Sequence, residues 1–236
     1  APVSLGMAWV SFVFFLAAIY LAVVYVHRRP FATLVAPAAF NWPRFAQAFG
    51  LWFLFGAIFA VFEALLHPGR YELTFNAANF IPFLFFALVF IPIQTSAEEF
   101  FFRAYILQSA SLRIKKNLNL ILLSGFLFML PHSANPEISV NLLLLPIFYF
   151  LFGAFLAYLT LKTNGLELAL GIHTANNLFT ALFANYAQSA LPTPSIFTAN
   201  ELDAGYNLVG FFFTAIVFYL WFFWLEKKPD SASVRP

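Results

Sequence analysis

The sequence has no cysteine and few charged residues, since Asp, Glu, Lys and Arg together make up 9% of its 236 residues. The lack of cysteine excludes disulfides, thiolate zinc sites and a cysteine nucleophile. Soluble domains carry about 25% charged residues, so this composition, with a mean hydropathy of +0.84, is not that of a protein surrounded by water. The net charge of +2 and the lack of a basic stripe give no indication of nucleic-acid binding.

The sequence is rich in phenylalanine and in long apolar runs. Phe occurs 35 times, and 62% of the residues are hydrophobic. A membrane span needs about 20 apolar residues, and the expected spans are 4–26, 46–66, 80–95 continuing through 97–112, 118–134, 138–161, 166–186 and 206–225. The predicted fold is therefore all-α, a polytopic transmembrane helix bundle of seven to eight membrane helices that forms a single membrane domain over residues 1–236.

The basic residues cluster between the apolar runs and predict the orientation of the chain. The first run is too long for a signal-peptide core and is interpreted as a retained membrane helix. Basic residues next to spans favour the cytoplasmic side, and seven net crossings with an outside N-terminus place all the basic clusters there. Residues 187–205 then form an external loop and residues 227–236 a C-terminal tail. Eight helices, with two full crossings over 80–112, are the competing topology.

The segment 80–112 is too long for one straight crossing, because as a helix it extends about 50 Å against a hydrocarbon core of about 30 Å. Pro92 disfavours a continuous helix, and Ser96-x-x-Glu99 has the spacing of a capping box that starts a helix. We therefore expect a helix break at 94–97, with the second half carrying two adjacent carboxylates, Glu98 and Glu99.

These carboxylates lie among phenylalanines, where each buried charge costs about 2.5–3.5 kcal/mol. Glu99 and Arg103 are separated by four residues, in the favourable order for an ion pair on one helix face. Glu98 lies about 100° away round the helix, so it is not needed for this ion pair and is the candidate for catalysis. An interfacial helix start with acids at its positive end is the alternative interpretation.

Two later spans carry polar residues in apolar surroundings. His132 follows Pro131, and His173 and Asn177 lie one helical turn apart among small residues. Each alone is explained by helix packing. Together with Glu98 they supply a carboxylate and a histidine able to deprotonate water, and an imidazole and a carboxamide able to donate hydrogen bonds to an oxyanion. These groups suit an amide hydrolase without a covalent intermediate, and the sequence has no serine nucleophile elbow, HExxH motif or glycine-rich phosphate loop.

The polar residues fall into three ordered motifs: Glu98-Glu99-x-x-x-Arg103, Phe128-x-x-x-His132 and His173-x-x-x-Asn177. Over residues 98–177 the chain resembles the CAAX protease and bacteriocin-processing family of intramembrane endopeptidases, the type II CAAX prenyl endopeptidase group, whose motifs are EExxxR, FxxxH and HxxxN. The resemblance implies that Glu99 and Arg103 shape a catalytic site in this region.

The same resemblance implies roles for the other motif residues. Glu98 and His132 would position and activate the hydrolytic water, while His173 and Asn177 would stabilise the tetrahedral oxyanion. The implied substrate is a membrane protein or lipidated peptide, such as a prenylated tail, a leader peptide or a bacteriocin precursor. The expected location is a prokaryotic plasma membrane, and the sequence leaves the oligomeric state open.

Three alternatives remain at this point. Glu98, His132 and His173 could bind zinc, but we expect a metal-free site without a cofactor, because an adjoining arginine competes for the carboxylates and no helical two-histidine pair is present. A proton-coupled transporter or channel could use the same buried Glu/His cluster, although no inverted repeat is visible. A non-catalytic scaffold could keep these residues for packing.

Overall fold

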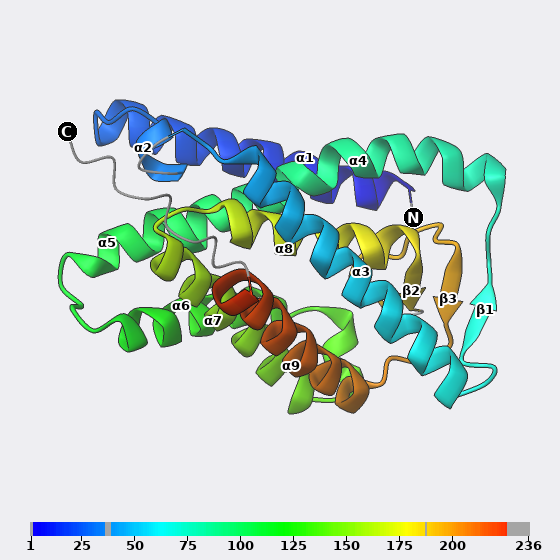
Figure 1. The fold of residues 1–236 in the computed structure, drawn as a ribbon. Coiled ribbons are helices and arrows are strands. Elements are labelled where there is room, and N and C mark those ends of the chain that lie inside the picture. The colour runs from blue at the N-terminus through cyan, green and yellow to red at the C-terminus, as the bar shows by residue number, and fades with distance from the viewer. Residues whose placement is uncertain (1, 36–38, 187, 226–236) are drawn as a thin grey trace, which may run out of the picture.

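Helices form most of the regular structure in the computed structural model, which describes residues 2–35, 39–186 and 188–225 (Figure 1). The C-terminal tail expected at 227–236 lies outside the described residues. The helices are α1 (Pro2–Leu21), α2 (Ala32–Val35), α3 (Trp42–Leu66), α4 (Ala77–Glu99), α5 (Leu107–Ser111), α6 (Asn117–His132), α7 (Leu144–Thr163), α8 (Glu167–Leu182) and α9 (Ala204–Leu220). The predicted all-α helix bundle is confirmed.

Shorter elements complete the chain. Three are π-helical, η1 (Ala22–Val26), η2 (Phe100–Ile106) and η4 (Trp221–Leu225), and η3 (Pro136–Val140) is a 3-10 helix. The strands β1 (Tyr71–Leu73), β2 (Ala184–Tyr186) and β3 (Phe197–Ala199) form a sheet in the order β1-β3-β2. β3 is antiparallel to β1 and parallel to β2. The sequence did not predict this small sheet.

Four of the described helices are long and apolar enough to cross a membrane: Trp42–Leu66, Ala77–Ser111, Leu144–Thr163 and Ala204–Trp224. Val10–Val26 and Asn117–His132 are apolar but shorter. The last helix of the motif region, α8, is not among them. The number of crossings therefore stays a prediction, although each expected span contains an α-helix.

The helix break expected at 94–97 is wrong, because α4 runs through these residues into η2 and α5 as one helix over 77–111. The hydroxyl of Thr95 donates to the carbonyls of Ile91 and Pro92 at 3.0 and 3.3 Å. Thr95 therefore bonds to the preceding turn of the same helix, and the helix does not end there. Glu99 acts as no cap, since its carboxylate binds groups elsewhere in the fold. The local signals for a helix start are overridden by these contacts.

Two expected spans also have different ends. The span predicted at 138–161 begins as a helix only at Leu144, because the side chain of Asn141 accepts hydrogen bonds from the backbone N–H groups of Leu143 and Leu144 at 3.1 and 2.8 Å. The span predicted at 166–186 ends as a helix at Leu182 and continues into β2.

Helix α8 is enclosed by other helices, and most of its residues are buried. It packs against α3, α4 and α7. A Cβ added at Gly171 would lie 2.7 Å from the carbonyl oxygen of Phe45 and 2.8 Å from Cβ of Ala48, so glycine allows α3 and α8 to approach closely. Because neighbouring helices cover α8, it can carry polar side chains that a lipid-facing helix would expose.

The two ends of the bundle differ in their connections. The strands gather at one end, and the turn between α5 and α6, with its basic residues, lies at the other (Figure 1). At the strand-bearing end, Arg70 binds Glu63 at 2.8 Å and Asp203 at 3.2 Å. The connection predicted as an external loop is therefore at the opposite end from the basic α5–α6 turn.

Candidate active site

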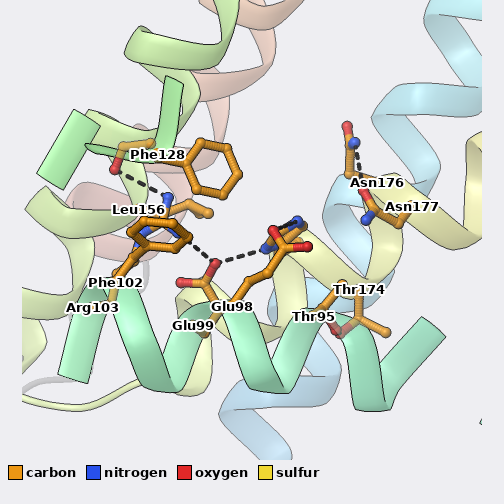
Figure 2. A network of polar contacts seen from close by, with 12 residues as sticks. Thr95, Glu98, Glu99, Phe102, Arg103, Phe128, Leu156, Thr174, Asn176 and Asn177 are labelled. Carbon is orange, nitrogen blue, oxygen red and sulfur yellow. Dashed lines mark hydrogen bonds and ion pairs between the residues drawn. The ribbon is translucent and has the colours of Figure 1, made fainter. Parts of the chain in front are cut away.

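The three motif segments meet around the carboxylate of Glu98, which projects from α4 (Figure 2). Oε2 of Glu98 lies 3.9 Å from Nε2 of His132, at the end of α6, and 3.8 Å from Nε2 of His173, on α8. Both distances exceed a direct hydrogen bond and suit bridging by an intervening oxygen atom. The fold thus brings together three residues that the sequence placed on separate spans.

Glu99 is fully buried and turns to different partners. Its Oε1 accepts hydrogen bonds from Nη1 of Arg103 at 3.0 Å and from Nδ1 of His173 at 2.7 Å. Figure 2 shows Glu98 and Glu99 as neighbours on one helix, with Arg103 beside Glu99. The expected ion pair between Glu99 and Arg103 is present, but its link to His173 was not predicted.

The hydrogen bonds of the two histidines fix which ring nitrogen faces Glu98. A backbone carbonyl only accepts, so Nδ1 of His132 donates to the carbonyl of Phe128 at 2.7 Å. Nε2 of the neutral His132 ring is then an acceptor on the side of Glu98. In His173, Nδ1 donates to the carboxylate of Glu99, and Nε2 again faces Glu98.

Aromatic rings hold His132 in place. Its ring lies 4.3 Å from the ring of Phe128 and 4.5 Å from that of Tyr149, measured between centroids, with small interplanar angles on both sides. Phe128 of the second motif therefore acts through both its ring and its carbonyl. Tyr149 was missed by the sequence reasoning, because a tyrosine in an apolar run gives no local signal of a distant stacking partner.

Arg103 joins three helices from within the core. Its guanidinium donates from Nη2 to the carbonyl of Gly153 on α7 at 3.3 Å and lies 4.2 Å from the ring centroid of Phe128. A cation over an aromatic face adds electrostatic attraction to these hydrogen bonds. The side chain is fully buried, so it positions Glu99 without access to water.

Asn177 follows His173 by one turn on α8 and lines the same cavity. Its side-chain oxygen accepts from Nδ2 of Asn176 at 3.2 Å (Figure 2). Gln94 on α4 was not predicted as a site residue, although its Nε2 lies 3.4 Å from Oε1 of Glu98. Its position one turn before Glu98 in an apolar run was a usable signal.

Helices α4 and α8 are also joined by two threonines that the sequence reasoning missed. The hydroxyls of Thr95 and Thr174 lie 2.9 Å apart, and both side chains are buried (Figure 2). This contact holds the two helices together one turn from Glu98.

A cavity of about 810 Å³ opens onto these groups, within the size range of small-molecule pockets. The apolar residues of its wall include Phe12, Phe15, Ile91, Phe101, Ile106 and Leu127. The polar residues of its wall include Gln94, Glu98, His132, Asn135, Glu137, Tyr149, His173, Asn176, Asn177 and Tyr186. The site can therefore offer both apolar contacts and hydrogen bonds to a molecule that it holds.

The residues considered as zinc ligands, Glu98, His132 and His173, are not grouped as a metal site, since among the described residues no group of three or more His, Asp or Glu side chains is arranged to hold a metal ion. The hydrogen bond from Nδ1 of His173 to Glu99 leaves Nε2 of that ring facing Glu98. The metal-free site therefore stays a prediction.

Residues 77–179 match the family model described as Type II CAAX prenyl endopeptidase Rce1-like. The chain is also 37% identical over 235 residues to the protein "Uncharacterized protein YyaK" of Bacillus subtilis (strain 168), a match that covers 97% of this chain and 78% of that protein. The chain belongs to the Rce1-like family. The matched region begins at α4 and ends within α8, so it contains all three motifs.

The Rce1-like family is a family of proteases, and with its long apolar helices this member is an integral membrane protein. No solved structure matches the chain. The resemblance found in the three motifs is thus confirmed at the level of the family.

Proposed function

We propose that this protein is an intramembrane endopeptidase that hydrolyses a peptide bond in a membrane-anchored or lipidated substrate. The observation that carries the proposal is the position of Glu98. Its Oε2 is buried without a hydrogen-bond partner among the described residues and lies 3.8–3.9 Å from the Nε2 atoms of His173 and His132, on the wall of a large cavity.

Glu98 and His132 would activate the water. A water between them donates one hydrogen to the carboxylate of Glu98 and the other to the unprotonated Nε2 of His132. Glu98 takes its proton as the water oxygen attacks the substrate carbonyl carbon and forms a tetrahedral intermediate. The C–N bond then breaks, and the same proton passes from Glu98 to the leaving amine. The other proton of the water stays on the attacking oxygen and ends on the new carboxyl group, so every proton is accounted for without a covalent enzyme intermediate.

His173 and Asn177 would stabilise the oxyanion of that intermediate. Because Nδ1 of His173 already donates to Glu99, Nε2 can donate to an oxyanion only when the ring is protonated. The charges allow this state, since Glu98 is protonated in the intermediate, and Arg103 and the imidazolium of His173 then balance the carboxylate of Glu99 and the oxyanion. Hydrogen bonds aimed at developing charge in a water-poor site contribute strongly to catalysis.

The substrate class follows from the cavity and the membrane. The apolar residues that line the cavity suit a lipid chain or an apolar helix, and its polar residues suit a peptide bond next to that apolar part. A prokaryotic plasma membrane is the proposed location, in keeping with the similar protein of Bacillus subtilis.

Cleavage by the purified chain in lipid vesicles tests the proposal. The probes are a peptide anchored by an apolar helix and a farnesylated peptide with a CAAX end, and mass spectrometry identifies the products. Glu98→Gln and His132→Ala should each lower the rate about 100- to 10,000-fold while thermal unfolding stays near wild type. Glu72→Gln, an exposed acid on β1, is the matched control. Undiminished cleavage by both site variants would contradict the mechanism.

Two further measurements separate the alternatives. Proton flux across the vesicles that is lost in the same variants, without any cleavage, would establish a transporter instead. Full activity after exhaustive chelation, with no zinc in elemental analysis, is expected for the metal-free site. Loss of activity on chelation and recovery with zinc would favour the metal-dependent alternative.

A further inference from the structure

The connection between α6 and α7 carries another buried carboxylate, Glu137, which the proposed mechanism does not use. Glu137 lies on η3 and is 2% exposed. Its Oε1 accepts hydrogen bonds from the hydroxyl of Tyr149 at 2.5 Å and from Nδ2 of Asn135 at 3.0 Å. Its Oε2 is buried and has no hydrogen-bond partner in the part of the chain that the structure describes. A buried oxygen of this kind is costly unless a ligand completes it.

Glu137 also differs from the nearby acids in having no basic partner. Glu99 is paired with Arg103, and Glu98 faces two histidines. None of the ion pairs found between described residues includes Glu137. A buried carboxylate without a cation is unfavourable, and a positive charge on a bound ligand would remove this cost.

Glu137 lies next to the proposed reaction centre. It lines the cavity of the proposed active site, and Tyr149, which donates to it, stacks on His132. Tyr186 of β2 lines the same region and interacts electrostatically with Glu137. Tyrosine rings next to a carboxylate favour a cation further. Only the side chain of Tyr149 therefore separates the carboxylate of Glu137 from His132, the proposed water-activating histidine.

We infer that Glu137, held by Tyr149 and Asn135, forms a subsite for a lysine or arginine side chain close to the scissile bond. This inference rests on the proposed function and adds a substrate class to it. The apolar residues of the cavity contact the lipid-embedded part of the substrate, and the subsite binds a basic residue that flanks this part. The preferred substrate is therefore an anchored peptide with a basic residue at one fixed distance from the cleaved bond.

The test uses the full chain in vesicles with pairs of N-acetylated peptides, each anchored by an apolar helix of about 20 residues. Members of a pair differ at one position near the anchor, which is either lysine or its uncharged isostere norleucine. The measured quantity is the ratio of kcat/KM for the two members, so a general loss of activity cancels. At one position the wild type should prefer lysine by about tenfold or more. Glu137→Gln should bring this ratio close to one, and Glu72→Gln should keep it.

The outcomes separate the inference from the proposed function. Cleavage by the wild type with equal rates for both members at every position would overturn the subsite and leave the endopeptidase standing. An unchanged lysine preference in Glu137→Gln would overturn it as well. If no peptide is cleaved, the proposed function fails, and equilibrium binding of the same pairs decides on the subsite. Tighter binding of the lysine peptide that is lost in Glu137→Gln supports it, and equal affinities overturn it.

Discussion

Replacing Arg103 by leucine should destabilise the protein by about 3–5 kcal/mol, because it removes the cation that pairs with the buried carboxylate of Glu99. The side chains of Arg103 and Glu99 are both fully buried, with Nη1 and Oε1 3.0 Å apart. At that distance, two unit charges attract by about 5–6 kcal/mol at an effective dielectric constant of 20. The variant also loses the donation to Gly153 and the contact with the ring of Phe128.

The free energy of unfolding in mixed detergent micelles measures this effect. Arg113→Leu is the matched control, because Arg113 is exposed in the turn after α5 and its loss should change the free energy by less than about 0.5 kcal/mol. The double variant Glu99→Gln with Arg103→Leu should be more stable than Arg103→Leu alone, since the unpaired charge is gone. A loss of less than about 1 kcal/mol in Arg103→Leu would refute the reasoning. So would a double variant whose loss in the free energy of unfolding equals the sum of the losses in the two single variants.

Two further predictions use the same unfolding assay. Gly171→Ala should cost about 1–3 kcal/mol, because its Cβ would lie 2.7 Å from a carbonyl oxygen of α3. Gly50→Ala, where no atom lies within 4 Å, should be neutral or stabilising by about 1 kcal/mol; equal losses in both variants would contradict this. The backbone N–H of Tyr206, aided by Arg70, holds the pKa of Asp203 below its ordinary value of 3.8. Asp203 therefore stabilises the fold above pH 3.8, and this stabilisation is lost as the pH falls through the lower pKa of the folded state. The melting temperature of Asp203→Asn should thus fall less with acid than that of wild type. Parallel curves of melting temperature against pH would contradict this.

The sequence predicted those parts of the fold and the site that depend on regular spacing. Apolar runs of suitable length predicted the helices, and a separation of four residues predicted the ion pair between Glu99 and Arg103. Both predictions depend on the geometry of a single helix, which one sequence displays directly. The meeting of Glu98, His132 and His173 was instead implied by the resemblance of the three motifs to those of a known family.

The wrong prediction in α4 came from interpreting local signals without their distant partners. Pro92 and the spacing of Ser96 and Glu99 are typical of a helix start, yet the helix continues through all three residues. Oε1 of Glu99 instead accepts a hydrogen bond from His173, 74 residues away. A capping box is favourable only when its side chains have no better partner, and the fold supplies one here.

The small sheet could not be predicted for a related reason. β1, β2 and β3 have three residues each, which is too short for an alternating pattern to appear. Their pairing joins connections far apart in the chain, such as Tyr71 with Ala199. Glu137 was missed because it belongs to a turn, where an acid is ordinarily solvated and carries no signal of burial.

The contact between Glu99 and His173 gives Glu99 a second role beside its ion pair with Arg103. Spacing alone assigns Glu99 to Arg103 and Glu98 to chemistry. In the structure, Glu99 also holds Nδ1 of His173, so that Nε2 of the same ring is directed at Glu98. Because the hydrogen bond of one ring nitrogen sets the tautomer and orientation of a histidine, the charge that Arg103 compensates also orients a ring of the proposed reaction centre. The buried ion pair therefore supports both the fold and the geometry of the site.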